Sequence, residues 1–214
     1  MNAKNTIWVV GATGLVGRAV VAELARDANV ERVVAVVRRP LEDAGIVVES
    51  KVVPFDELES RLTAGPVDVA ICCLGTTIKQ AGSQAAFRKV DHDYVLSFAR
   101  AAKRAGAKRF IVVTALGANP RSLTFYNRVK GEVEAELATL GFEALTIVRP
   151  SLLLGDRSET RIGERLAAPF SRFLPQSIRG IEGTTVARAI VRLTHDTGHG
   201  RRLVPSAELQ ILGA

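Results

Sequence analysis

The stretch Val9–Arg18, VVGATGLVGR, carries glycines at positions 11, 14 and 17. The apolar run Thr6–Ala12 predicts a β-strand, and apolar residues that recur with a helical period from Leu15 to Leu24 predict an α-helix directly after it. A Gly-x-x-Gly-x-x-Gly turn between a strand and a helix is the context that a dinucleotide-binding fingerprint requires. The stretch therefore predicts a site for the pyrophosphate of a dinucleotide, the alternative being a turn that binds no ligand.

Each glycine has its own predicted task in such a site. Gly11 permits a tight turn, Gly14 lets the backbone approach the pyrophosphate, and Gly17 lets the helix lie close to the strand. The unpaired N–H groups and the positive dipole end of the helix would receive the phosphates. We therefore expect the whole turn to contact the cofactor, which includes Gly11, Ala12, Thr13, Gly14, Leu15, Val16 and Gly17. A P-loop is excluded, because Arg18 and Ala19 stand where it needs a lysine and a hydroxyl.

Apolar runs of strand length alternate with segments of helical period along most of the chain. Strands are expected at 6–12, 30–37, 51–54, 68–74, 109–116 and 144–151, and helices at 15–24, 91–105, 126–140, 163–173 and 184–195, with a last strand near 203–209. This alternation predicts a Rossmann-type α/β fold with a doubly wound parallel sheet, formed by residues 1–214 as a single domain. The pattern loosens beyond Gly155, and we expect residues 156–214 to contribute a small C-terminal cap on the substrate side.

Composition and charge narrow the function classes. The chain is 47% apolar and 24% charged, as in ordinary globular proteins. It shows neither a secretory signal nor the ~20-residue apolar run that spans a bilayer, so a cytoplasmic protein without a membrane partner is expected. The net charge is +7, but the basic residues are scattered and aromatic residues are few, so nucleic acid is not an expected partner. Cys72 and Cys73 are adjacent in an apolar run, which predicts buried thiols rather than a disulfide.

The end of the second expected strand, Val36–Pro40, indicates which dinucleotide binds. An acid about 20 residues beyond the glycines would accept hydrogen bonds from the ribose 2′-hydroxyl of NAD(H). Here Arg38 and Arg39 occupy this place, and the next acid is Glu42. Two guanidiniums suit a 2′-phosphate, so NADP(H) is favoured over NAD(H). The alternative is that both arginines only solvate the strand end.

Tyr126 and Lys130 are four residues apart, so that both would lie on one helical face. A nearby ammonium favours the phenolate form of a tyrosine, which would allow Tyr126 to exchange a proton with a substrate. Lys130 could also hold the nicotinamide ribose. Thr114, at the end of the fifth expected strand, offers a hydroxyl at the same edge of the sheet.

Several longer motifs share one resemblance: CLGTT at 73–77, DHDYVL at 91–96, YNRVKGEVE at 126–134 and VRPSLLLGDR at 148–157. With the glycine turn, they resemble the short-chain dehydrogenase/reductases, and in particular the atypical branch that contains the Tat-interacting oxidoreductase. The resemblance runs from about Thr6 to beyond Arg179. It implies a Rossmann fold, NADP(H) binding and reductase chemistry, whereas the substrate does not follow from it.

The resemblance also implies roles for individual residues. Tyr126 would be the general acid/base, Lys130 its electrostatic partner and ribose ligand, and Thr114 the hydroxyl that orients a substrate oxygen. The cofactor would also contact Leu74, Gly75 and Thr76 after the fourth strand, and Arg149, Pro150 and Ser151 would pass the nicotinamide. One departure concerns the fifth strand, where the family usually has serine, often as a pair, and this chain has Thr114-Ala115. A register that places Ala115 at the catalytic position would remove the substrate-orienting hydroxyl.

Four further residues are expected to have structural roles. Asp91 is expected to cap the helix that begins there, the alternative being support of a proton relay to the lysine. Trp8 is expected in the core. His195 and His199 are four apart, but Gly198 intervenes and no third ligand is evident, so no metal is expected.

The sequence thus predicts an NADP(H)-dependent oxidoreductase that transfers hydride to or from an unidentified carbonyl or alcohol compound. The alternative is a non-catalytic NADP(H)-binding sensor or regulatory protein that binds a partner. An epimerase or dehydratase that retains NAD is disfavoured by Arg38-Arg39 and by the chain length. A homodimer is compatible with the family resemblance.

Overall fold

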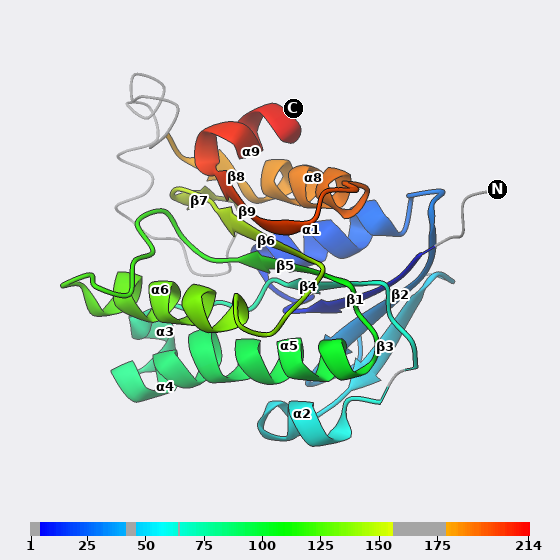
Figure 1. The fold of residues 1–214 in the computed structure, drawn as a ribbon, viewed down its shortest axis with the longest axis horizontal. Helices are drawn as coiled ribbons and strands as arrows, with labels where there is room; N and C mark the ends of the chain where they lie inside the picture. Colours follow the sequence, from blue (N-terminus) through cyan, green and yellow to red (C-terminus); the bar gives the residue numbers. More distant parts are fainter. Residues whose placement is uncertain (1–4, 42–45, 64, 156–178) are drawn as a thin grey trace.

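A seven-stranded parallel sheet forms the centre of the protein in the computed structural model, which describes residues 5–41, 46–63, 65–155 and 179–214 (Figure 1). The strand order is β3-β2-β1-β4-β5-β6-β9, and every neighbouring pair is parallel. The strands are β1 (Asn5–Val10), β2 (Val30–Val37), β3 (Val48–Val52), β4 (Val69–Cys72), β5 (Arg109–Val113), β6 (Ala144–Arg149) and β9 (Gly200–Pro205). The chain reverses its winding direction between β1 and β4, and open parallel sheets bind ligands at such a switch point. The predicted Rossmann-type fold is confirmed.

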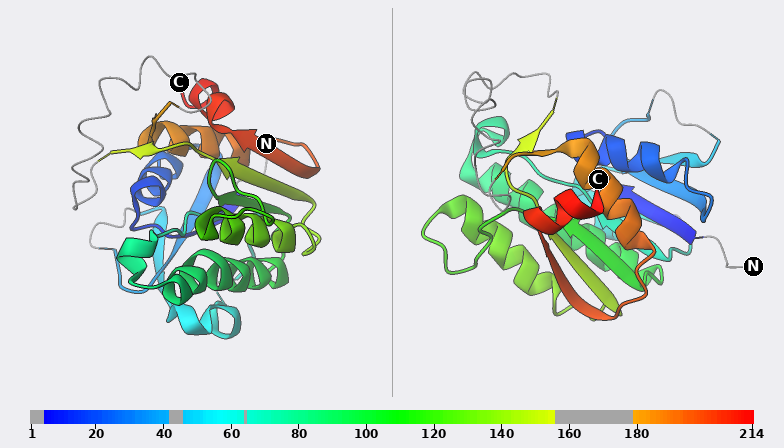
Figure 2. Two further views of the ribbon diagram at one scale, coloured as in Figure 1. Left: turned by 90° about the vertical axis from the view of Figure 1, so that its left-hand side faces the viewer. Right: turned by 90° about the horizontal axis from the view of Figure 1, so that it is seen from above.

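Helices cover both faces of the sheet (Figures 1 and 2). One face carries α1 (Leu15–Leu24), α8 (Gly183–Thr194) and α9 (Ser206–Leu212). The other face carries α2 (Leu58–Arg61), α5 (Tyr94–Arg104) and α6 (Phe125–Leu137). Shorter segments complete this second layer: a 3-10 turn at Phe55–Glu57, α3 (Ile78–Ala81), α4 (Gln84–Arg88) and a π-helical turn at Lys89–Asp93.

Side chains of β1 alternate between the two cores that these layers enclose. Ile7 and Val9 pack into the core beside α1 and α8, whereas Trp8 and Val10 pack into the core beside α5 and α6, and all four are fully buried. A strand that is covered on both faces has no polar side, which explains the continuous apolar runs in the sequence. The expectation that Trp8 packs in the core is confirmed. Both cysteines are free thiols; Cys72 is buried in the second core as predicted, whereas Cys73 is only half-buried, because it follows β4 at the edge of the sheet.

The helix expected at 91–105 begins earlier than the sequence indicated. The chain is helical from Gln84 through α4 and the π-helical turn into α5, which ends at Arg104. The Ser83 hydroxyl caps the start of α4 by accepting a hydrogen bond of 3.1 Å from the N–H of Ala86. Asp91 therefore lies inside the π-helical turn rather than at a helix N-terminus, and the prediction that it caps a helix is wrong.

The C-terminal part of the chain extends the sheet. β9 covers Gly200–Pro205 and pairs with β6, while Leu209, expected at the end of a strand, is a buried residue of α9. Residues 183–214 of the expected cap thus complete the sheet and one helical layer, and a two-residue ladder joins β7 (Leu153–Leu154) to β8 (Ile181–Glu182). The helix expected at 163–173 lies outside the described residues. Within the described ranges, no helix has the length and apolarity needed to cross a membrane.

Candidate active site

Two of the three glycines in the β1–α1 turn are required because the turn packs closely against other backbone segments. Gly11 has φ +80°, and a Cβ atom there would lie 2.6 Å from the backbone carbonyl of Cys73. A Cβ atom at Gly17 would lie 2.1 Å from the carbonyl oxygen of Gly11. Any side chain at either position would overlap backbone, so these glycines let the turn, α1 and the end of β4 lie in contact.

Gly14 lacks such a packing reason. The nearest atom to a Cβ there would be the carbonyl oxygen of Gly11, at 3.3 Å, and the residue is exposed with an ordinary φ of −79°. Gly14 is also the N-cap of α1, where no side chain bonds the free N–H groups and the first turn holds no acid. A pyrophosphate binds to unpaired backbone N–H groups that no side chain shields. The N-terminus of α1 offers such groups beside Gly14, so this turn fits a dinucleotide.

Two cavities lie against this turn, of about 820 and 740 Å³. Both sizes are typical of small-molecule sites. The larger is lined by twelve of the predicted site residues: Thr13, Gly14, Leu15, Val16, Leu74, Gly75, Thr76, Thr114, Tyr126, Lys130, Pro150 and Ser151. The smaller shares several of these and adds Gly11, Ala12, Arg38 and Arg39. Gly17 is buried and lines neither, because it packs beneath the turn.

The smaller cavity is basic on the side of β2. Arg38 and Arg39 are both exposed, and the Arg38 guanidinium lies 5.5 Å from the centre of the Phe55 ring. The described residues that line this cavity include no aspartate or glutamate. Phe55 and Tyr94 also line it, and the sequence indicated neither: Phe55 lies in none of the quoted motifs, and Tyr94 lies in DHDYVL without an assigned role. The cavity can therefore stabilise a phosphate group beside an aromatic surface.

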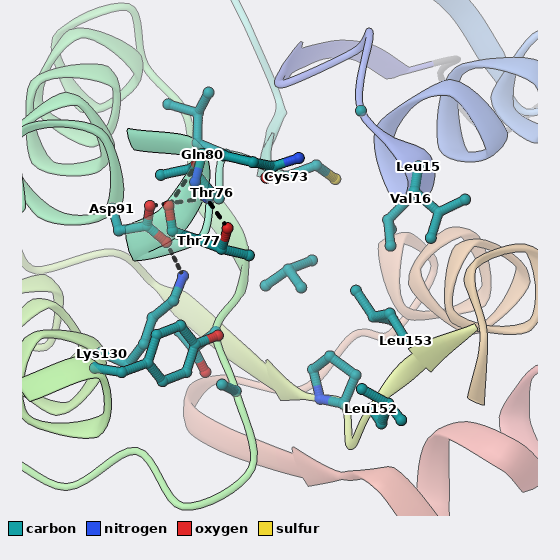
Figure 3. Close-up of a pocket in the computed structure, with 18 of the residues that line it drawn as sticks. Leu15, Val16, Cys73, Thr76, Thr77, Gln80, Asp91, Lys130, Leu152 and Leu153 are labelled. Atoms are coloured by element: carbon teal, nitrogen blue, oxygen red, sulfur yellow. Dashed lines mark hydrogen bonds and ion pairs between the residues drawn. The ribbon is translucent and has the colours of Figure 1, made fainter. Parts of the chain in front are cut away.

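The polar wall of the larger cavity centres on a buried ion pair. The Nζ of Lys130 lies 2.7 Å from Oδ1 of Asp91, and the other carboxylate oxygen accepts a 2.9 Å hydrogen bond from the backbone N–H of Thr76 (Figure 3). Asp91 is fully buried and Lys130 is 3% exposed. Burial by itself disfavours the ammonium, but the neighbouring Asp91 and Tyr126 outweigh it and raise the pKa of Lys130. Lys130 is therefore a cation held at the cavity wall by Asp91.

Tyr126 lies one helical turn before Lys130 on α6, as the spacing predicted, and lines the same cavity. Its half-buried ring packs 5.4 Å from the ring of Phe87 on α4, measured between centroids. Gly131 brings this part of α6 against the loop before it, since a Cβ there would lie 2.2 Å from the backbone of Asn119. The phenol and the ammonium are thus placed by packing on both sides of the helix.

A second buried carboxylate lies one turn further along α6. Glu134 is 1% exposed, and its Oε1 accepts hydrogen bonds from Thr114 Oγ1 at 2.6 Å and from Arg149 Nε at 2.9 Å. The Arg149 guanidinium also bonds the other carboxylate oxygen. Ala115 lines the larger cavity beside Thr114 and offers no polar group. The sequence analysis missed Glu134, although its four-residue spacing from Lys130 places it on the same helical face.

The opposite wall of the larger cavity is apolar. Leu15, Val16, Leu152 and Leu153 line the side of the cavity that lies away from the Lys130–Asp91 ion pair (Figure 3). The Ser151 hydroxyl, predicted to contact the cofactor, donates to the carbonyl of Arg179 and accepts from the Ser206 hydroxyl at 2.9 Å. These bonds tie the end of β6 to the C-terminal part of the chain.

Other reactive groups lie outside this constellation. Burial raises the pKa of the Cys72 thiol to about 12, so it stays protonated at neutral pH. His195 Nε2 lies 2.6 Å from Oδ2 of Asp27. Over the described residues, no three histidine, cysteine or acidic side chains form a group that could hold a metal ion.

Comparison with known proteins identifies one matching family model, described as NAD(P)H-binding, over residues 11–197. The protein HTATIP2 of Rattus norvegicus is 37% identical over 205 residues, which cover 92% of this chain and 84% of that protein. The mitochondrial protein FMP52 of Eremothecium gossypii is 38% identical over 149 residues, covering 70% of this chain and 66% of that protein.

Solved structures with the same fold include sugar-nucleotide enzymes. MoeE5 in complex with UDP-glucuronic acid and NAD superposes with a TM-score of 0.74 at 18% identity, covering 94% of this chain and 76% of that one. The UDP-glucose 4-epimerase of Thermotoga maritima superposes with a TM-score of 0.72 at 15% identity, covering 97% and 80%. At these identities, the likeness shows the fold alone.

Proposed function

Because the chain belongs to the NAD(P)H-binding family, in the atypical branch of the short-chain dehydrogenase/reductases, we propose that it is an NADP(H)-dependent oxidoreductase that acts on a carbonyl or alcohol group. One observation carries this proposal: Tyr126 and the Asp91-paired Lys130 line the same cavity as the uncovered backbone of Gly14. A phenol and a fixed cation thus lie beside the place that fits a dinucleotide.

The residues of the chain would divide the work as follows. The first-turn amides of α1 bind the pyrophosphate, and Arg38 and Arg39 bind a 2′-phosphate. Lys130 donates to the nicotinamide ribose while Asp91 holds its ammonium in place. Tyr126 gives a proton to the substrate oxygen during reduction and takes it back during oxidation. The bound nicotinamide supplies the hydride, so the protein contributes position, charge and a proton.

The preference for NADP(H) has a direct test in ligand-induced thermal stabilisation. A ligand that binds only the folded state raises stability by RT ln(1 + [L]/Kd), so the better cofactor gives the larger shift at equal concentration. We expect NADPH to raise the melting temperature more than NADH does. Equal shifts would remove the role proposed for Arg38 and Arg39.

The reaction itself is tested by NADPH oxidation against a panel of carbonyl compounds. Replacing a general acid/base typically lowers turnover by about 10²- to 10⁴-fold, and we expect this loss in Tyr126→Phe. Tyr94→Phe is the matched control at saturating NADPH, because this second phenol bonds Asp56 at 2.9 Å and lines the smaller cavity but not the larger one. Equal turnover by Tyr126→Phe and the parent protein would show the catalytic assignment to be wrong.

A non-catalytic NADP(H) sensor is the second candidate, and one feature favours it. The Thr114 hydroxyl donates to Glu134, and Ala115 beside it has no hydroxyl, so the substrate-orienting donor expected from the family resemblance is missing from both positions. A sensor would bind NADPH tightly, and no carbonyl compound of the panel would cause NADPH oxidation.

An enzyme that retains NAD, such as an epimerase or a dehydratase, would release NAD on denaturation, and absorbance at 260 nm would detect the released nucleotide.

Cellular location is a separate prediction. We keep the cytoplasm as the proposed location, and the fungal relatives named as mitochondrial make the mitochondrion the competing one. Microscopy of the fluorescently tagged protein would distinguish the two.

A further inference from the structure

The Thr114 hydroxyl donates its hydrogen bond within the protein. Its two neighbours are acceptors, Oε1 of Glu134 at 2.6 Å and the carbonyl oxygen of Val148 at 3.4 Å. Glu134 faces the Arg149 guanidinium through both carboxylate oxygens, and Arg201 Nη2 lies 3.9 Å from Oε2. An ionised carboxylate can only accept hydrogen bonds, so the single hydrogen of Thr114 points toward Glu134.

This orientation decides what Thr114 can offer to a ligand in the larger cavity, which it lines together with Ala115 and Tyr126. A hydroxyl that has given its hydrogen to a carboxylate has only lone pairs left. A ketone oxygen also has only lone pairs, and two acceptors that face each other leave both unsatisfied. A substrate hydroxyl, in contrast, carries the hydrogen that Thr114 lacks.

We propose that Thr114, oriented by Glu134, accepts a hydrogen bond from a substrate hydroxyl next to the reacting carbonyl, and that the site therefore selects α-hydroxy ketones and the corresponding 1,2-diols. The proposal rests on the oxidoreductase function proposed above. In the reduction, hydride from the nicotinamide adds to the carbonyl carbon, the C=O π bond breaks, and the oxygen takes a proton from Tyr126. The neighbouring hydroxyl stays intact, and Tyr126 regains its proton from water.

Glu134 is a positioning residue in this scheme, because it acts through Thr114. It stands at a junction of three elements, since it belongs to α6, Thr114 directly follows β5, and Arg149 ends β6. Arg149 is also followed by Pro150 and Ser151, which line the larger cavity. The carboxylate therefore fixes the hydroxyl in relation to the helix that carries Tyr126.

The test compares 2-hydroxyacetophenone with 2-methoxyacetophenone. Both carry an electron-withdrawing oxygen beside the carbonyl, but only the first has a hydroxyl hydrogen to donate. Dissociation constants are measured by calorimetry on the chain of 214 residues saturated with NADP⁺, which has no hydride to give to either ketone. One neutral hydrogen bond corresponds to a preference of roughly two- to twelvefold, and we expect this preference for the hydroxy ketone.

Three variants assign the preference to Thr114. Thr114→Val removes the acceptor while keeping the shape, and the ratio of the two dissociation constants should fall by the same roughly two- to twelvefold. Thr114→Ser keeps a hydroxyl that Glu134 can orient and should retain the ratio. Thr146→Val makes the same change at a buried strand residue that does not line the larger cavity, and it should also retain the ratio.

The outcomes separate this proposal from the proposed function. Equal affinities in the parent protein, an unchanged ratio in Thr114→Val, or binding of neither ketone would each overturn the role of Thr114. NADPH oxidation by the hydroxy ketone without any binding preference would leave the oxidoreductase standing and remove only this role. A Thr114-dependent preference without NADPH oxidation would keep the role of Thr114 and refute the oxidoreductase.

Discussion

The two ends of the proposed cofactor site are built in different ways. At the glycine turn, the protein presents backbone, and its arginines lie exposed at the end of β2. At α6, it presents side chains, and Lys130 and Asp91 are both buried. The first end depends on the absence of Cβ atoms, whereas the second depends on the presence of paired charges. Substitutions at the two ends should therefore fail for different reasons.

The largest effect is expected at the buried charges. Asp91→Ala leaves the Lys130 ammonium buried without its partner, and breaking a buried pair in this way costs about 3–5 kcal/mol of unfolding free energy. Urea denaturation at pH 7 measures the loss. The control is Glu132→Ala on α6, the helix that carries Lys130; it removes the partner of Arg88 on α4 in a partly exposed pair and should cost about 0–1 kcal/mol. Similar losses in both variants would contradict the importance of burial.

The next effect separates two glycines of one turn. Gly17→Ala places a Cβ atom 2.1 Å from a backbone oxygen and should destabilise the protein by about 1–3 kcal/mol, as overpacking does. Gly14→Ala meets its nearest atom at 3.3 Å and should cost less stability than Gly17→Ala while it weakens NADPH binding. Thermal melts with and without NADPH measure both quantities. A Gly14→Ala variant that binds NADPH normally would speak against the pyrophosphate site.

A smaller effect is expected at the exposed arginines. Loss of one charge-assisted bond to a 2′-phosphate should reduce the preference for NADPH over NADH by about tenfold in Arg38→Ala or Arg39→Ala. The ratio of the two dissociation constants measures this preference. Arg26→Ala, a change at an exposed side chain that lines neither cavity, serves as the control. An unchanged ratio in both variants would indicate that the arginines only solvate the strand end.

The smallest effect is a pH dependence of stability that arises from Cys72, the last residue of β4. Burial raises the pKa of Cys72 from 9.0 to about 12. The unfolded chain therefore loses this proton first, and stability falls as the pH rises above 9, by about 1 kcal/mol at pH 9.5. Urea denaturation at pH 7.5 and 9.5 measures the decrease in unfolding free energy between the two pH values. This decrease should be about 1 kcal/mol smaller in Cys72→Ala than in the parent protein. An identical pH dependence in both proteins would show that the thiol is not buried from water.

Local patterns predicted the frame of the molecule. Apolar runs of strand length and apolar residues with a helical period predicted β1, β2, α1 and α6 to within a few residues of their observed bounds. These patterns follow directly from backbone geometry. The spacing of Tyr126 and Lys130 likewise depends only on the pitch of one helix. Where local signals were weak, the predictions failed: the serine cap of α4 went unnoticed, and Leu209 was assigned to a strand.

By itself, the sequence determined the Rossmann frame, the glycine turn and the helical face that carries Tyr126 and Lys130. Only the tertiary structure decided the partners of the buried polar groups: Asp91 bonds Lys130 and the loop after β4, and Thr114 gives its hydrogen to Glu134. The physical reason is that a period or a required φ angle is a property of neighbouring residues. The partner of a buried charge is instead selected by the cost of leaving it unpaired, and packing brings that partner from a distant part of the chain.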